Sequence, residues 1–252
     1  GLGTVTPVAW PSIKVIVIAD YAKGTMSREV MNAVRHYANA YGIPIFVDAR
    51  PSTMDLYQQV SLLKPNLREA MAMLADVVHP GLSESYSSDV RCQTACAELR
   101  KKYQAGLVVV TDGPRGCHYT EPDDGGMIHV CEPPHRDGDV SDVCGAGDTV
   151  MAGLVAGFME GKPFSMSVEL AMDAASWVVQ FRGVKAALRD HIEEMRYKNV
   201  GWPAKLMTPP LLAEFIARKR RLRPDAVIVL TNGCFDGLHA GHLETLRFAA
   251  RE

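Results

Sequence analysis

The segment best suited to chemistry covers residues 142–150, which read DVCGAGDTV. Gly145, Ala146 and Gly147 are small enough for a phosphate to press against the main chain, and an apolar helical pattern follows them directly. The first N–H groups of a helix are unpaired and carry partial positive charge, so such a helix start attracts anions. We therefore expect these three residues to form an anion hole.

Asp148 follows this turn at once. A carboxylate beside a phosphate site repels the anion, but it is needed where a neighbouring hydroxyl must lose its proton. Asp148 is therefore our candidate for the catalytic base of a phosphoryl transfer. The alternative is a glycine-rich turn in which Asp148 is an ordinary N-cap, since short glycine motifs recur by chance.

Other segments of the chain occur in an order that matches one family. DYAKG at 20–24 follows an apolar run, Asp48 ends the next one, residues 64–69 read KPNLRE, and residues 111–116 read TDGPRG. With GAGD at 145–148, they resemble the successive elements of the ribokinase-like (PfkB-type) carbohydrate kinases, including the N-x-x-E element and the T-x-G-x-x-G nucleotide loop. Several collinear motifs are more specific than any one of them.

The resemblance implies further roles. Asn66 and Glu69 would act on Mg²⁺ and the ATP phosphates through water, although a helix-start Asn and a first-turn Glu also favour a helix without any ligand. Thr111, Gly113 and Gly116 would shape the nucleotide pocket, and the alternative is an ordinary turn after a strand.

The match to the family is not complete. Asp142 would either orient the loop or contact phosphate-bound Mg²⁺. Cys144 stands where the family commonly has Thr, and a thiol is a weaker hydrogen-bond partner. Asp48 is followed by Ala49 and Arg50 where related kinases often have Pro-Lys. An arginine keeps the charge of a lysine but not its geometry, so we assign Arg50 no role.

A second motif lies near the end of the chain. Residues 231–242 read TNGCFDGLHAGH and follow a β-branched run at 226–230. They resemble the start of a cytidylyltransferase-like nucleotidyltransferase, in which His239 and His242 would bind a triphosphate at a helix N-terminus. A metal site is the alternative, because His is a common ligand.

A kinase followed by this transferase resembles the bifunctional enzymes that join a heptose 7-phosphate kinase to a heptose 1-phosphate adenylyltransferase in lipopolysaccharide-core precursor synthesis. The resemblance implies ATP- and Mg²⁺-dependent phosphorylation of D-glycero-β-D-manno-heptose 7-phosphate at O1. Alternatives are another ribokinase-like kinase, for ribose, fructose or a nucleoside, and a non-catalytic fragment that retains nucleotide binding. The expected partners are a sugar phosphate and a nucleotide, with a homodimer as a further candidate.

The composition is that of a globular protein, with 252 residues, of which 47% are hydrophobic and 22% charged. The net charge of -2 gives no electrostatic argument for nucleic acid or an anionic membrane. Six cysteines form no C-x-x-C pair, no apolar run approaches a membrane span, and the N-terminus lacks a signal pattern. We expect a cytoplasmic enzyme with reduced thiols.

The elements that must position these residues alternate along the chain. Strands are expected over 13–19, buried on both faces, and over 44–47, 60–63, 107–111 and 127–131. Helices are expected after Ser27 as N-cap and up to Gly42, over 67–74 and 88–104, and over 147–184 with a break at 161–163. This order predicts an α/β fold of the ribokinase-like three-layer α/β/α type with a mostly parallel sheet. Asp20, Asp48 and Thr111 would then meet at one sheet edge.

We divide the chain into three parts. Residues 1–195 would be the C-terminal part of a ribokinase-like kinase domain, 196–224 a linker, and 225–252 the first strand and helix of an incomplete Rossmann-like nucleotidyltransferase. By the resemblance, the upstream kinase strands, the lid, much of the sugar site and most of the transferase would be missing. Such an incomplete sheet would expose apolar edges and favour aggregation or a partner chain.

Overall fold

The computed structural model describes residues 12–121, 127–133, 140–192 and 240–249, together with 208–209, 212–213, 216–217, 220 and 227–229. The chain divides into two compact units, Gly1–Asn199 and Val200–Glu252. The described sheet and the candidate site both lie in the first unit.

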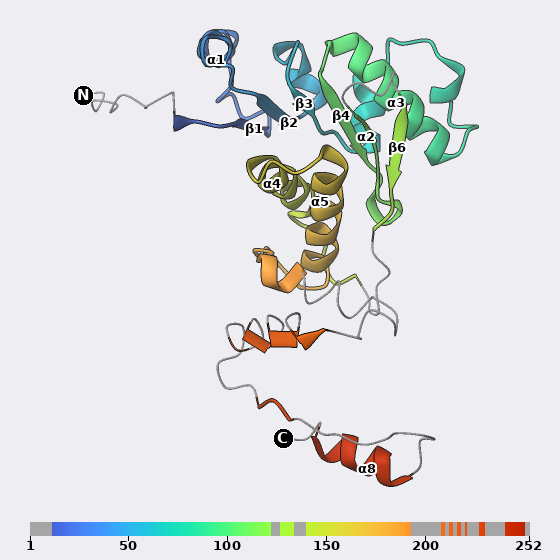
Figure 1. Cartoon of the computed structure of the whole chain (residues 1–252). Helices are drawn as coiled ribbons and strands as arrows, with labels where there is room; N and C mark the ends of the chain where they lie inside the picture. Colours follow the sequence, from blue (N-terminus) through green and yellow to red (C-terminus); the bar gives the residue numbers. More distant parts are fainter. Residues whose placement is uncertain are drawn as a thin grey trace. The chain divides into compact units, whose positions relative to one another are not determined.

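Six strands form one mixed sheet in which the strand order follows the chain order (Figure 1). The first four strands are parallel, and the last two are added in antiparallel orientation. The strands are β1 (Ile16–Asp20), β2 (Ile45–Ala49), β3 (Leu62–Leu63), β4 (Leu107–Thr111), β5 (Cys117–Thr120) and β6 (Ile128–Cys131). The mostly parallel sheet predicted from the alternation is confirmed, whereas β5 is not predicted, because its residues CHYT lack an apolar pattern.

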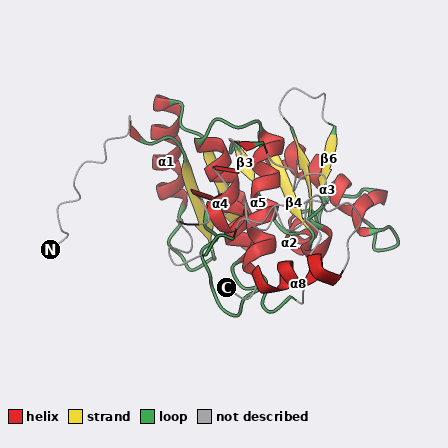
Figure 2. Ribbon diagram, turned by 60° about the horizontal axis from the view of Figure 1, so that its bottom comes forward, coloured by secondary structure: helices red, strands yellow, loops and turns green. Residues whose placement is uncertain are grey.

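Helices cover both faces of this sheet. One face carries α1 (Arg28–Tyr41), α2 (Leu67–Met73) and α3 (Ser88–Tyr103), and the other carries α4 (Ala146–Met159) and α5 (Phe164–Val178). Figure 1 shows α4 and α5 side by side, and in Figure 2 the same two helices lie across the strands. Short 3₁₀ turns are η2 (Pro51–Leu56), η3 (Pro80–Leu82) and η4 (Gly113–Arg115). The three-layer α/β/α arrangement is therefore confirmed.

Each face of the sheet has its own hydrophobic core, because successive side chains of a strand point to opposite faces. Val47 and Leu63 pack with the α1–α3 side, whereas Phe46 and Leu62 pack with α4 and α5. Strands buried on both faces read as continuous apolar runs, which is why these segments are recognisable in the sequence.

The ends of α1 follow from two residues that the sequence already indicates. The Ser27 hydroxyl accepts a hydrogen bond from the Val30 N–H at 3.3 Å, and Gly42 ends the helix in the left-handed region with φ 63°. Both ends of α1 are therefore fixed, and the chain continues from Gly42 into β2.

Two predicted elements are corrected. The run at 13–19 is not buried on both faces: the strand begins at Ile16 and lies at the sheet edge, and Val17 is 44% exposed there. The helical pattern expected to reach residue 184 ends at Val178, because the Val179 carbonyl accepts the N–H groups of Ser141 and Asp142.

In the second unit, the helix that the histidine motif is expected to open is α8 (Ala240–Ala249). The strand expected over 226–230 is not seen at 227–229, which have no regular secondary structure, and 226 and 230 lie outside the described residues. A strand needs a neighbour for its backbone hydrogen bonds, and no described residue pairs with 227–229. None of the described helices is both long and apolar enough to cross a membrane.

The close packing of α4 on α5 depends on glycine at position 153. A Cβ atom there would lie 2.5 Å from the Ala171 Cα atom. We expect Gly153→Ala to lower the free energy of unfolding by about 1–3 kcal/mol through overpacking, although alanine in a free helix is favoured by about 1 kcal/mol. Urea denaturation measures this, with the exposed Ala156→Gly as control, expected to lose about 1 kcal/mol by propensity alone. A more stable Gly153→Ala variant would contradict the close approach.

Candidate active site

A polar cavity of about 420 Å³ opens where the strands end and α4 begins. The predicted grouping is confirmed, since Asp20, Asp48 and Thr111, from three strand ends, all line it. The predicted site residues that also line it are Asn66, Glu69, Gly113, Gly145, Gly147 and Asp148. The structure therefore brings most of the sequence-predicted site residues to one place.

The N-terminus of α4 forms one wall of this cavity. Gly145 precedes the helix with φ 75° in the left-handed region, and the Thr149 N–H and hydroxyl both donate to its carbonyl at 2.9 and 2.8 Å. The N-cap is therefore Gly145, and Asp148 lies in the first helical turn. The alternative interpretation of Asp148 as an ordinary N-cap is wrong.

The N–H groups at this helix end differ in their availability. The Ala146 N–H donates to the Val143 carbonyl at 3.2 Å. Among the described residues, no acceptor is hydrogen-bonded to the N–H groups of Gly145, Gly147 and Asp148. Two of the three predicted donors, those of Gly145 and Gly147, are thus open to an anion together with that of Asp148, whereas the Ala146 N–H is occupied within the loop.

A buried ion pair forms the floor of the cavity. Lys64 Nζ lies 2.7 Å from Asp48 Oδ2, and the Lys64 side chain is only 3% exposed. Burial raises the pKa of Asp48, the Lys64 ammonium opposes that rise, and the Glu69 and Asp148 carboxylates add to it. A Cβ atom at Gly147 would be 3.6 Å from Lys64 Nζ, so the ammonium approaches the start of α4. The sequence analysis assigned no catalytic or binding role to Lys64 or Asp48. The feature that could have indicated their ion pair is a lysine directly after a buried strand.

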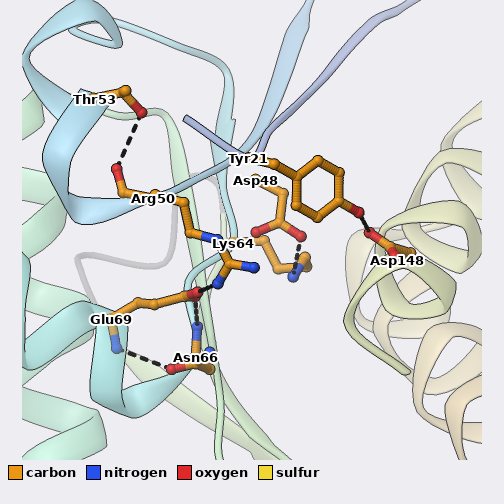
Figure 3. A network of polar contacts seen from close by, with 8 residues as sticks. All are labelled: Tyr21, Asp48, Arg50, Thr53, Lys64, Asn66, Glu69 and Asp148. Atoms are coloured by element: carbon orange, nitrogen blue, oxygen red, sulfur yellow. Dashed lines mark hydrogen bonds and ion pairs between the residues drawn. The ribbon is translucent and has the colours of Figure 1, made fainter. Parts of the chain in front are cut away.

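Figure 3 shows how the strand side of the cavity reaches α4. The Tyr21 hydroxyl donates to Asp148 Oδ1 at 2.7 Å, and this hydrogen bond is the main cause that raises the pKa of Tyr21. The Arg50 guanidinium carbon lies 5.7 Å from the centroid of the Tyr21 ring, and Arg50 forms an ion pair with Glu69. Tyr21 and Arg50 are thus cavity residues that the sequence analysis left without roles.

Asn66 and Glu69 form a capping box at the start of α2. The Asn66 side-chain oxygen accepts the Glu69 N–H at 2.9 Å, and the Asn66 N–H donates to Glu69 Oε2 at 3.0 Å. The structural interpretation of this pair is therefore confirmed. Both residues also line the cavity. In addition to this capping role, a water-mediated role of Asn66 and Glu69 in Mg²⁺ binding stays a prediction.

A second, mostly apolar cavity of about 380 Å³ adjoins the first. Thr111, Gly113 and Gly147 line both, so the two cavities lie side by side. Gly116 lines the apolar one with φ 90°, and a Cβ atom there would meet the Cys131 carbonyl oxygen at 2.1 Å. The sequence analysis did not predict the apolar walls of this second cavity, because their residues have the pattern of a helix core or a loop. They include Val140, Val143, Val150, Met172 and Val179.

Asp142 shapes the loop that leads into α4. Its two carboxylate oxygens accept the N–H groups of Cys144 at 2.9 Å and Gly183 at 3.0 Å, and these bonds lower the pKa of Asp142. Asp142 is not among the residues that line either cavity. Of the two alternatives, this geometry favours loop orientation.

The predicted transferase residues belong to the second unit. His242 lies in α8 and is half-buried, whereas His239 lies outside the described residues. Their role in triphosphate binding therefore stays a prediction. Among the residues that the structure describes, no group of three or more His, Cys, Asp or Glu side chains is arranged to hold a metal ion.

The chain is similar in sequence and in fold to known proteins. Residues 8–191 match the family described as pfkB family carbohydrate kinase. The chain therefore belongs to the pfkB family, whose members are phosphotransferases that act on a hydroxyl group of a sugar.

Among curated proteins, the chain is 31% identical over 234 residues to the bifunctional protein HldE of Stutzerimonas stutzeri, covering 93% of this chain and 46% of that protein. It is 34% identical over 239 residues to HldE of Methylobacillus flagellatus, covering 93% and 45%. The chain thus spans about half the length of these curated relatives.

Among solved structures, phosphofructokinase-2 from Escherichia coli aligns with a TM-score of 0.59 at 20% identity, covering 73% of this chain and 57% of that one. A ribokinase from Cryptococcus neoformans in complex with ADP aligns with a TM-score of 0.61 at 17% identity, covering 77% and 63%. At this identity the likeness shows a shared ribokinase-like fold.

The buried ion pair gives the site a measurable energetic signature. Lys64→Met leaves the Asp48 carboxylate buried without its counter-charge, so we expect the free energy of unfolding to fall by about 3 kcal/mol at neutral pH. Because burial already raises the pKa of Asp48, protonation of the unpaired carboxyl should shrink the deficit as the pH falls.

Urea denaturation across pH measures this, and Lys102→Met is the matched control. Lys102 pairs with Asp76, which is 72% exposed, and its ammonium also donates to the Met73 carbonyl at 2.8 Å, so that change should cost only about 1–2 kcal/mol. Equal losses for the two variants, or a Lys64→Met deficit that is independent of pH, would contradict the role given to the pair.

Proposed function

We propose that this chain carries the phosphoryl-transfer site of an ATP- and Mg²⁺-dependent sugar kinase, with Asp148 as the catalytic base. The observation that carries the proposal is a carboxylate in the first turn of α4, beside open N–H groups, inside a cavity at the strand ends. Anion binding and proton acceptance are thereby available within one helical turn.

In the proposed reaction, the Asp148 carboxylate accepts the proton of the sugar hydroxyl as that oxygen attacks the γ-phosphorus. The N–H groups at positions 145, 147 and 148, together with the partial charge of the helix end, bind the transferring phosphoryl group. The buried Lys64 ammonium adds positive charge near the same point. The protein therefore supplies position and charge compensation.

The two adjoining cavities suit a nucleotide. The base would occupy the apolar cavity, and the phosphates would pass Thr111 and Gly113, which line both cavities, to reach the start of α4. Asn66 and Glu69 line the polar cavity and would hold Mg²⁺ through water. When bound, the metal ion would neutralise phosphate charge.

For the sugar we propose D-glycero-β-D-manno-heptose 7-phosphate, phosphorylated at O1. Support comes from the order of the kinase motifs and the His239–His242 element, and from similarity to HldE proteins across 93% or more of this chain. We further propose that residues 225–252 begin a nucleotidyltransferase, with 196–224 as the linker.

The test of this function is Mg²⁺-dependent ADP release from ATP in the presence of heptose 7-phosphate. We expect Asp148→Asn to lower kcat by about 10²- to 10⁴-fold, because an amide cannot accept the proton. The matched control is Asp55→Asn, an exposed carboxylate outside both cavities, which should keep full activity.

Other outcomes reject separate parts of the proposal. Faster turnover of ribose, fructose or a nucleoside would contradict the heptose assignment alone. An active Asp148→Asn variant would remove Asp148 as the base. Calorimetric ATP binding without turnover of any sugar would indicate a non-catalytic fragment.

A further inference from the structure

Tyr21 connects two parts of the polar cavity that are 127 residues apart in sequence. It directly follows β1, and its hydroxyl donates to Asp148 Oδ1 on α4 at 2.7 Å (Figure 3). Among the described residues, no other side chain is hydrogen-bonded to the Asp148 carboxylate. The orientation of this exposed carboxylate therefore depends on the phenol.

The Tyr21 ring is itself held in place from the opposite side. The Arg50 guanidinium lies 5.7 Å from the ring centroid, within the range of a cation–π contact. Arg50 is in turn held by the ion pair with Glu69, which belongs to the capping box of α2. Although Tyr21 is 49% exposed, contacts at both ends of its side chain restrict its position.

This arrangement gives the two carboxylate oxygens of Asp148 different roles. A phenol that donates to Oδ1 occupies one lone pair of that oxygen and leaves both lone pairs of Oδ2 free to accept a hydrogen bond. A base must have its lone pair directed at the hydroxyl before the proton moves, so a fixed carboxylate reacts more readily than a freely rotating one.

We propose that Tyr21 is a positioning residue for the phosphoryl transfer: its hydroxyl occupies Oδ1 of Asp148 and so presents Oδ2 to the sugar hydroxyl. The proposal rests on the function proposed above. A competing assignment follows from the same contact, because the phenol donates to Asp148 just as an acceptor hydroxyl would. In that case Tyr21 would block the base until the sugar displaced it.

Kinetics separate these two assignments. Positioning predicts that Tyr21→Phe lowers kcat about tenfold, the loss expected for one hydrogen bond to a charged group, with KM for ATP unchanged. In an Asp148→Asn background the same change should cost nothing further, because the positioned base is already absent. Tyr41→Phe is the matched control, since Tyr41 is 51% exposed and lies on α1 outside the polar cavity. A rise of kcat in Tyr21→Phe would overturn the proposal. It would also be overturned if Tyr21→Phe lowered kcat as much in the Asp148→Asn background as in the wild type.

A second measurement does not require turnover. The hydrogen bond to Asp148 raises the pKa of Tyr21, so the phenol should titrate at lower pH in Asp148→Asn than in the wild type. With 3-fluorotyrosine, whose phenol is more acidic, ¹⁹F NMR can follow this in the folded protein, and Tyr21→Phe identifies the resonance.

This readout distinguishes the two levels of the proposal. A downward shift in an inactive protein would support the contact while the kinase assignment failed. Identical titration of Tyr21 in the two proteins would overturn the contact, whatever the activity.

Discussion

The ion pair between Lys64 and Asp48 ties the ends of two neighbouring strands together beneath the start of α4. A parallel sheet brings all its carboxyl strand ends to one edge, and in this chain that edge is rich in acids. Four carboxylates line the same cavity, and neighbouring like charges oppose ionisation. The cavity therefore depends on a specific donor for each of them. The pairs are Tyr57 with Asp20, Lys64 with Asp48, Arg50 with Glu69, and Tyr21 with Asp148.

The four donors are not equivalent, and their differences separate structural carboxylates from the candidate base. Asp48 is paired with the Lys64 ammonium and Glu69 with the Arg50 guanidinium. Asp20 is buried and also accepts the Ala22 N–H. Asp148 is exposed and has a neutral phenol as its partner. A base must take up a proton and release it in each cycle, so the exposed carboxylate with a neutral partner suits that task best.

What the sequence predicted depended on local signals. The cap at Ser27, the strand at 107–111 and the glycine turn before α4 each follow from a few adjacent residues. The grouping of strand ends followed from one topological rule. The contact of Tyr21 with Asp148 could not be predicted in this way, because it joins residues 127 positions apart through a side-chain geometry that no local pattern encodes.

Burial caused the remaining errors of the sequence analysis. In β5, His118 and Thr120 are buried although polar, since the strand pairs on both sides within the sheet. In β1, by contrast, an apolar run is half-exposed because β1 lies at the edge. The type of a residue indicates how strongly its side chain favours the protein interior. The position of the strand in the sheet decides whether that side chain is buried.

The junction between the two cavities sets the direction in which a nucleotide would bind. Thr111, Gly113 and Gly147 line both cavities, and one end is apolar while the other holds the ionised groups. A purine ring favours the apolar end, and a triphosphate favours the open N–H groups of α4. On the proposed function, the terminal phosphate is then the part of ATP that reaches Asp148, because the opposite orientation would place charge among Val140, Met172 and Val179. The polarity of the cavities would thus select the orientation in which phosphoryl transfer can occur.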